Sequence, residues 1–119
     1  MLGDISGMNS IYVITGRTDM RKSFDSLILL VQDTFKLDPY SKSVFLFCGR
    51  DASKLKALYH DRDSWILLQK RLDGDGRFQW PRNSSEARLI TRQQLRWLLE
   101  GLSIDQPKAI KTSFKKKDI

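Results

Sequence analysis

The sequence predicts an α+β domain: an antiparallel β-meander of about four to five strands, with one helix after the first strand and a second helix near the C-terminus. Strand-like runs at 43–48, 54–60 and 65–72 follow one another through loops short enough to require antiparallel neighbours. Apolar residues at helical spacing precede and follow these runs. We expect both helices to pack on the same face of the sheet.

A short buried strand and a helix are predicted before the meander. Residues 11–14 are β-branched or aromatic and end at a Thr-Gly turn, which is typical of a strand. Thr18 or Asp19 is placed to cap the first free N–H groups of the helix, and the Asp-Pro pair at 38–39 stops it. The apolar positions at helical spacing are Met20, Phe24, Leu27, Ile28, Val31 and Phe35.

After the meander, the turn-forming Asp and Gly residues at 73–76 precede a possible further strand at 77–80, and residues 82–88 read as loop. The last helix opens with Thr91, followed three residues later by Gln94, which is a capping-box pattern. Gly101 is placed to end it. Its apolar face is formed by Leu95, Leu98, Leu99 and Leu102.

The chain has 119 residues, and its Lys and Arg residues exceed its acidic residues by seven. This length fits one domain. We expect a flexible lead-in at 1–10, a single domain at 11–104 and a basic, disordered tail at 105–119. Residues 107–119 of this tail contribute more than half of the net charge of +7. A polyanionic partner follows from this charge.

Cysteine and histidine are too few for a zinc site or a disulfide framework, because the chain has only Cys48 and His60. Cys48 ends an apolar run and is expected to be a small buried hydrophobe. The glycines lack the spacing of a nucleotide-binding loop. No apolar run of about 18 residues and no signal-peptide pattern occur. We therefore expect a soluble, cytoplasmic protein with no cofactor, no metal and no membrane partner.

The strongest candidate site is a positively charged turn at the start of the first helix. Arg17, Arg21 and Lys22 surround it. Exposed N–H groups and guanidinium forks at such a turn can grip a phosphate together. In the alternative interpretation, Arg21 and Lys22 face solvent and Arg17 pairs with Asp19 or Asp25.

A second group of cations follows the meander. Lys54 and Lys56 share a predicted strand face with His60, and Arg50 and Arg77 lie near the turns. We expect one wet, positive face that tracks a phosphate backbone, with aromatic residues that either stack on bases or belong to the core. The predicted nucleic-acid-binding residues are Arg17, Arg21, Lys22, Arg50, Lys54, Lys56 and Arg77.

No catalytic residue is predicted. Asp61, Asp63, Asp73 and Asp75 lie in predicted turns, where Asp is favoured because its carboxylate accepts nearby backbone N–H groups. A metal-dependent nuclease built from these aspartates is the least favoured interpretation.

Several motifs occur in a characteristic order along residues 11–102. They are Thr15-Gly16-Arg17-Thr18-Asp19-Met20-Arg21-Lys22-Ser23-Phe24-Asp25, Asp38-Pro39, Val44-Phe45-Leu46-Phe47, Lys54-Leu55-Lys56 with Leu58-Tyr59, Lys70-Arg71-Leu72, Gly76-Arg77-Phe78-Gln79-Trp80-Pro81 and Leu98-Leu99-Glu100-Gly101. In this order they resemble the TnpB-type accessory proteins, encoded by the second open reading frame in insertion sequence family sixty-six. The chain departs from that pattern at Ser23 and Ser26, where glycine is usual, and at 61–64, where the turn is typically richer in glycine.

The resemblance implies an accessory role in bacterial transposition, beside a separate transposase that performs strand transfer. Combined with the charge pattern, it predicts a non-catalytic protein that binds DNA, with the element ends as the expected DNA and the transposase of the same element as the protein partner. The alternative is an adaptor that binds the transposase without recognising DNA directly.

Overall fold

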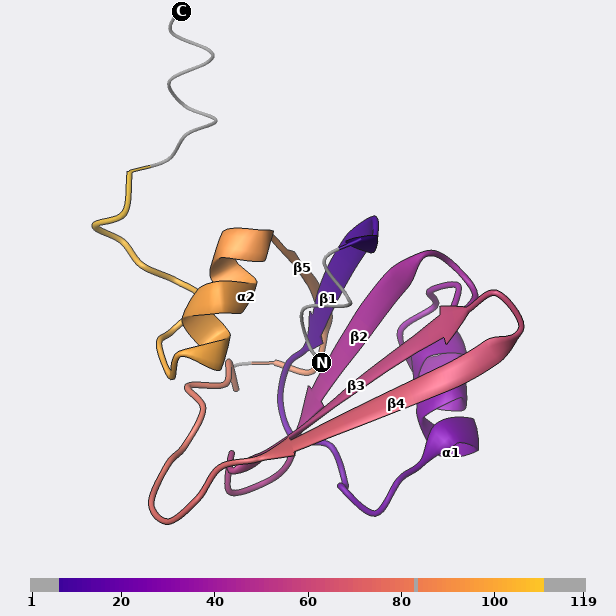
Figure 1. Ribbon diagram of the computed structural model, residues 1–119, viewed down its shortest axis with the longest axis horizontal. Coiled ribbons are helices and arrows are strands. Elements are labelled where there is room, and N and C mark those ends of the chain that lie inside the picture. Colours follow the sequence, from indigo (N-terminus) through magenta and orange to yellow (C-terminus); the bar gives the residue numbers. More distant parts are fainter. Residues whose placement is uncertain (1–6, 83, 111–119) are drawn as a thin grey trace, which may run out of the picture.

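The computed structural model describes residues 7–82 and 84–110. The first six residues and the lysines predicted for the tail beyond residue 110 lie outside the described residues. The elements are β1 (Ser10–Ile14), α1 (Phe24–Leu29), the π-helix η2 (Leu30–Thr34), β2 (Ser43–Cys48), β3 (Lys54–Asp61), β4 (Ser64–Arg71), β5 (Ala87–Ile90) and α2 (Arg92–Leu99). They form one mixed five-stranded sheet in the order β4-β3-β2-β1-β5 (Figure 1).

The predicted meander is confirmed for β2, β3 and β4, which pair antiparallel in sequence order. The prediction of a wholly antiparallel sheet is wrong, because β1 pairs with β2 in parallel. The segment between these two strands contains α1 and η2, so it is long enough to carry the chain back across the sheet. β5 then adds antiparallel to the other side of β1.

The prediction of a strand at 77–80 is also wrong. Phe78 and Trp80 are buried in the core, but this segment does not join the sheet. The Phe78 N–H donates to the Ala52 carbonyl (2.8 Å), and the Trp80 indole N–H donates to the Ile14 carbonyl (2.9 Å). The alternating aromatic residues of this segment therefore pack across the end of the sheet without forming a strand. The fifth strand lies at 87–90, partly inside the segment predicted as loop.

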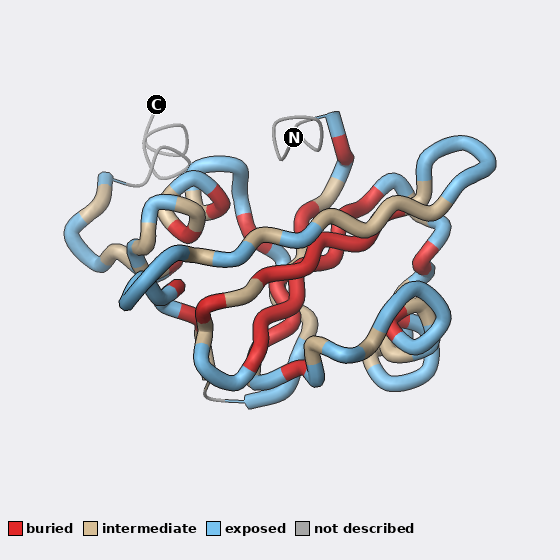
Figure 2. The backbone as a smooth tube through the Cα atoms, turned by 60° about the horizontal axis from the view of Figure 1, so that its bottom comes forward, coloured by how far each residue is buried: buried red, intermediate tan, exposed pale blue. Residues whose placement is uncertain are grey.

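The two helical layers cover opposite faces of the sheet, which contradicts the prediction that they share one. Leu27 of α1 and Val31 of η2 pack with Phe45 and Phe47. Leu95 and Leu98 of α2 belong to a second cluster, which also contains Ile11, Val13, Val44, Leu46 and Cys48. Successive strand residues point to opposite faces, so β2 is buried along its whole length (Figure 2). Cys48 is buried, as predicted.

The first helix begins later than predicted. Ser23 is the residue before α1, and neither Thr18 nor Asp19 caps it. The Asp19 carboxylate instead accepts the backbone N–H of Arg21 (2.9 Å), which closes a local turn. This side-chain-to-backbone bond competes with helix formation and keeps residues 19–22 in a loop. Leu27 is fully buried, whereas Phe24 is 40% exposed.

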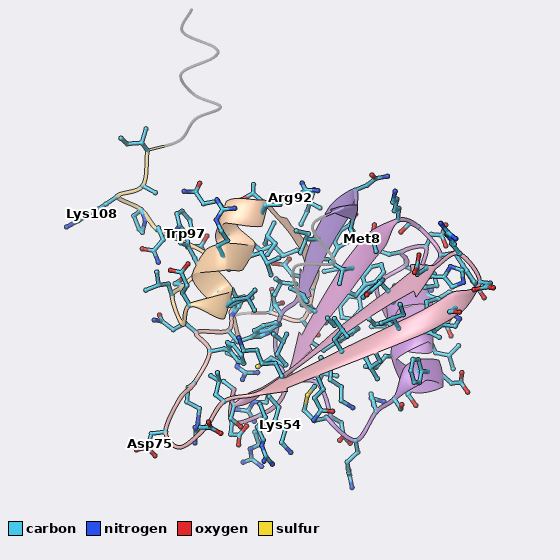
Figure 3. All side chains as sticks on the ribbon, in the orientation of Figure 1. Met8, Lys54, Asp75, Arg92, Trp97 and Lys108 are labelled. Atoms are coloured by element: carbon cyan, nitrogen blue, oxygen red, sulfur yellow. The ribbon has the colours of Figure 1, made fainter. Side chains whose placement is uncertain are left out.

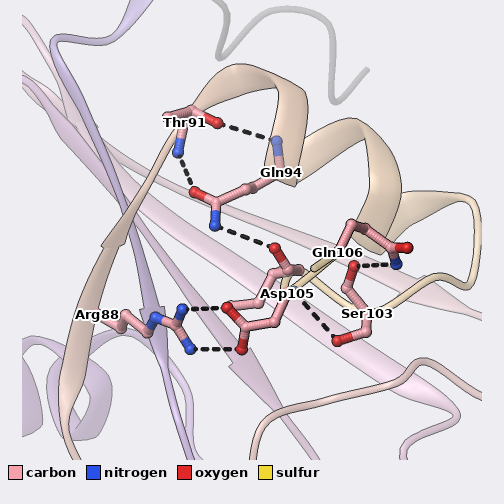
Figure 4. Close-up of polar contacts among 7 residues, drawn as sticks. Arg88, Thr91, Gln94, Ser103, Asp105 and Gln106 are labelled. Atoms are coloured by element: carbon pink, nitrogen blue, oxygen red, sulfur yellow. Dashed lines mark hydrogen bonds and ion pairs between the residues drawn. The ribbon is translucent and has the colours of Figure 1, made fainter. Parts of the chain in front are cut away.

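The second helix begins and ends as predicted. The Thr91 hydroxyl accepts the Gln94 N–H (3.1 Å), and the Gln94 side chain accepts the Thr91 N–H (2.9 Å), which completes the capping box (Figure 4). Gly101, with φ +86°, follows the helix. The Leu102 N–H donates to the Trp97 carbonyl (2.8 Å) and the Gly101 N–H to the Leu98 carbonyl (3.1 Å), forming a Schellman motif.

Residues after α2 are tied back to the sheet and the helix (Figure 4). Arg88 of β5 makes a two-pronged ion pair with Asp105, with N–O distances of 3.0 and 2.5 Å. The Gln94 side chain also donates to the Ile104 carbonyl (3.1 Å). Among the described residues, no helix has the length and apolar character needed to cross a membrane.

The β3–β4 turn contains a residue in a conformation that favours glycine. Arg62 has φ +56° and is exposed. A side chain with a Cβ atom is strained there by about 1 kcal/mol. We expect Arg62→Gly to raise the free energy of unfolding by up to about 1 kcal/mol, measured by urea denaturation, after the greater flexibility of glycine in the unfolded chain is included. Arg62→Ala keeps the Cβ atom, so an equal gain in that variant would contradict this explanation.

Candidate nucleic-acid interface

Most of the predicted cations gather at the loop-bearing edge of the sheet, which is the edge formed by the carboxyl ends of β1 and β2. β1 and β2 run in parallel, so the loop after each strand leaves from the same edge. The loop after β1 carries Arg17, Arg21 and Lys22, and the turn after β2 carries Arg50. The two loops are joined directly by a hydrogen bond from the Thr18 N–H to the Cys48 carbonyl (2.9 Å).

Arg82 fixes these two loops relative to each other. Its Nη1 donates to the Gly16 carbonyl (2.7 Å) and its Nη2 to the Gly49 carbonyl (2.7 Å). The adjacent Pro81 carbonyl accepts the Gly16 N–H (2.9 Å). One guanidinium group thus holds both loops through their backbones.

An open depression of about 780 Å³ lies between the two loops and the start of β3. It is lined by Thr18, Asp19, Met20, Arg21, Gly49, Arg50, Asp51 and Lys54. Lys54 projects at the loop-bearing end of the long strands (Figure 3). Gly49 allows the close approach of the loops, because a Cβ atom there would lie 2.7 Å from Met20 Cγ. The depression therefore brings together Arg21, Arg50 and Lys54 from separate elements.

Arg21 is partly neutralised by its neighbour. Its guanidinium pairs with the Asp19 carboxylate at 2.9 Å. The side-chain hydrogen bond from Arg21, followed by the bond from its backbone N–H, lowers the pKa of Asp19 to about 2. The alternative interpretation named Asp19 as a partner of Arg17, but the structure gives this carboxylate to Arg21.

Three of the predicted cations keep their charged groups available. Within residues 7–82 and 84–110, the side chains of Arg17, Arg50 and Lys54 make no hydrogen bond or ion pair. Arg17 and Arg50 are exposed, and Lys54 is half-buried. These side chains are free to contact an external anion without first breaking an internal ion pair.

Lys56 lies on the same strand face as Lys54 but is buried, with 6% exposure. Its Nζ donates to the Lys22 carbonyl at 2.6 Å. Burial lowers the pKa of Lys56, with Asp19 opposing that effect. The ammonium group of Lys56 thus anchors the loop before α1 to β3 and does not project into solvent.

Lys22 and Arg77 lie beside the depression. Lys22 is half-buried and uses its carbonyl to hold Lys56. Arg77 is exposed and donates to the Gly76 carbonyl of its own turn (2.7 Å). Its charge helps to lower the pKa of Asp51, whose main stabilisation comes from hydrogen bonds donated by Ser53.

The predicted wet face of β3 is wrong. Lys54, Lys56 and His60 do share a face, but Leu58 between them is fully buried in the α1-side core. His60 lies toward the opposite sheet edge, where its ring contacts Trp65 (centroids 4.7 Å apart) and Tyr40 (4.9 Å). The positive surface is therefore the loop-bearing edge, where β1 and β2 end, and not one of the two faces of the sheet.

The four turn aspartates cannot form one site. Asp61 and Asp63 precede β4, whereas Asp73 and Asp75 follow its end. An eight-residue strand separates the two pairs by roughly 25 Å. In the described part of the chain, no group of three or more His, Cys, Asp and Glu residues is placed to hold a metal ion.

Arg82 was not among the predicted site residues, although it determines the geometry of the depression. Its role depends on the Gly16 and Gly49 carbonyls, which are distant in sequence from Arg82 and from each other. No spacing or periodicity signals such a contact. A basic residue directly after a proline was the only local feature.

Comparison with known sequences assigns the chain to a family. The family described as IS66 Orf2 like protein matches residues 9–109. The chain belongs to this family. The resemblance noted from the motifs is thereby confirmed, and the coarse function follows: this IS66 Orf2-like chain is an accessory protein of an insertion sequence.

Two similar proteins come from Sinorhizobium fredii (strain NBRC 101917 / NGR234). Uncharacterized protein y4hO is 43% identical over 103 residues, which cover 86% of this IS66 Orf2-like chain and 89% of the relative. Uncharacterized protein y4jC is 29% identical over 102 residues, with 86% of each chain covered. No solved structure matches the chain.

We expect Arg82→Lys to lower the free energy of unfolding by about 1–3 kcal/mol, because one ammonium group cannot reproduce the forked geometry that holds both carbonyls. Chemical denaturation of the two proteins measures the difference. Arg50→Lys is the matched control, since the Arg50 side chain has no described partner. Equal losses in the two variants would show that Arg82 does not hold the loops.

Proposed function

We propose that the protein binds DNA through the loop-bearing edge of the sheet and acts in transposition without catalysing strand transfer. The observation that carries this proposal is the convergence of Arg21, Arg50 and Lys54 on one open depression, with Arg17 exposed on the same loop as Arg21. Family membership gives the insertion-sequence context. The net charge of +7 favours a polyanion at long range.

The depression suits phosphate groups better than base edges. Arginine forks and a lysine ammonium neutralise phosphates and release condensed counterions on binding. The loops after β1 and β2 and the first residue of β3 carry these cations, and no described helix carries any of them into a position to enter a groove. We therefore propose backbone-directed binding, with element-end DNA as the physiological ligand and the transposase as the source of sequence selection.

Asp19 competes with an external anion for the Arg21 guanidinium at this edge. Its carboxylate occupies the Arg21 guanidinium in the free protein. A phosphate that uses Arg21 has to compete with this carboxylate, whereas Arg17, Arg50 and Lys54 need no such exchange. The first contacts of DNA are thus expected at the unpaired cations.

A non-catalytic role is part of the proposal. The turn aspartates lie at both ends of β4, so they do not form a single four-carboxylate site of the kind that would favour a nuclease. Asp63 accepts a hydrogen bond from the Ser64 hydroxyl (2.9 Å).

DNA affinity should depend on Arg50 and Lys54 together. We expect the double variant Arg50→Gln/Lys54→Gln to bind duplex DNA at least about tenfold more weakly, and the slope of log K against log salt to fall by about 2, because two phosphate contacts are lost. Fluorescence anisotropy across a salt series, on element-end DNA and on unrelated duplex, measures both quantities.

The matched control is Lys36→Gln/Lys42→Gln. Both lysines are exposed and precede β2, at the opposite edge of the sheet, and their loss changes the net charge equally. An equal loss of DNA affinity in the two double variants would show that net charge alone explains the effect, and would overturn the proposal of a local binding site. Binding that appears only when the transposase is added would favour the adaptor role instead.

Lys54 and Lys56 provide a sharper comparison within one strand. We expect Lys54→Met to weaken DNA binding and leave stability nearly unchanged. Lys56→Met should leave the affinity of the folded protein within about twofold of the original and lower the free energy of unfolding by about 1 kcal/mol, because the bond to the Lys22 carbonyl is lost. Anisotropy and urea denaturation of both variants check this; a larger affinity loss for Lys56→Met would contradict the assignment.

A further inference from the structure

β4 is an edge strand with an unusual composition. It is eight residues long and occupies one end of the sheet order. Its central residues, Trp65 to Leu68, are all apolar and only half-buried, although the middle of the neighbouring strand β3 is buried (Figure 2). Edge strands of soluble proteins are usually short or interrupted by proline, bulges or charges, because a long apolar edge pairs readily with another strand. β5, at the other edge, has four residues.

The hydrogen-bonding direction of each β4 residue follows from the register. The two-residue turn places Asp61 opposite Ser64, and the Leu72 N–H donates to the Ser53 carbonyl (2.9 Å) at the far end of the hairpin. Even-numbered residues from 64 to 72 therefore bond to β3. The N–H and C=O groups of Trp65, Leu67 and Gln69 point away from the sheet, and no described segment pairs with them.

The charges along this edge are arranged to match a second copy of the same edge. Asp63, directly before β4, is acidic, whereas Lys70 and Arg71 at the end of the strand are basic. Asp63 and Arg71 are both exposed. A two-fold axis perpendicular to the sheet would place two β4 strands antiparallel, so that the acidic end of each faces the basic end of the other.

The register centred on Leu67 satisfies both the backbone and the charges. In this register the two-fold axis passes between the Leu67 residues of the two copies. Trp65, whose N–H and C=O groups point away from the sheet, then lies opposite Gln69 of the second copy, and Asp63 lies opposite its Arg71. A register centred on Leu68 would instead oppose Asp63 to Asp73, which places like charges together. We propose that two copies of this protein associate through β4 in antiparallel pairing centred on Leu67, which extends the sheet across the dimer.

Charge reversal at the ends of the pairing tests this proposal. Asp63→Arg or Arg71→Asp alone should raise the dimer dissociation constant at least about tenfold, because each change creates two repulsive contacts per dimer. The double variant Asp63→Arg/Arg71→Asp should restore association, since the reversed charges again face each other. Sedimentation equilibrium of the nuclease-treated full chain over a concentration series measures the constants, and thermal unfolding confirms that each variant folds.

Amide hydrogen exchange provides a second readout of the same pairing. In the dimer, the N–H groups of Leu67 and Gln69 should be protected at high protein concentration and exchange rapidly on dilution. A protein that stays monomeric throughout the series would overturn the proposal. So would a dimer that is insensitive to both single reversals and leaves these two amides unprotected. Neither measurement uses DNA, so its outcome is separate from that of the DNA-binding proposal.

Discussion

Parallel pairing of β1 with β2 is the constraint on which the rest of the structure depends. It forces the connection between them to cross one face of the sheet, which places α1 and η2 there and leaves the other face for α2. It also brings the ends of both strands to one edge, so loops far apart in sequence lie together. A wholly antiparallel meander would have sent these loops to opposite edges, and the charges of Arg21 and Arg50 could not have met at one depression.

The side chains that anchor the loops at this edge keep their positive charge unneutralised. Arg82 and Lys56 both donate to backbone carbonyls, so they fix the loops without pairing with a carboxylate. A carbonyl satisfies the buried donor, but it leaves the formal charge of the donor in place. The potential at the edge thus includes cations whose donors are already engaged by backbone carbonyls. Asp19 is the exception, because its carboxylate offsets Arg21 directly.

Local patterns in the sequence were sufficient for the elements that depend on local physics. β2, β3 and β4 follow their apolar runs, and the capping box of α2 forms between Thr91 and Gln94 because its partners are three residues apart. The start of α1 was misjudged because the Asp19 carboxylate bonds the Arg21 N–H within a turn, which competes with capping a helix. The prediction that both helices share one face was wrong because β2 is apolar along its whole length and is covered by a helical layer on each side.

The site was harder to predict than the fold because availability of a charge depends on distant contacts. Lys54 and Lys56 have the same chemistry and the same strand face, yet the loop before α1 covers only Lys56. Arg82, a residue with no local signal, sets the geometry of both loops. The charge count and the motifs located the basic region, whereas the partition into contacting cations and anchoring cations required the three-dimensional arrangement.

The two proposed surfaces lie on different sides of the molecule and constrain each other geometrically. The basic edge lies at the carboxyl end of β4, and the proposed dimer runs two β4 strands in opposite directions. The basic edges of a dimer would therefore face opposite ways, separated by at least the length of β4, roughly 25 Å. One duplex could not lie along both edges without strong bending, since DNA is stiff over this length. A dimer of this form would hold two separate DNA segments, which suits an accessory protein of an element that has two ends.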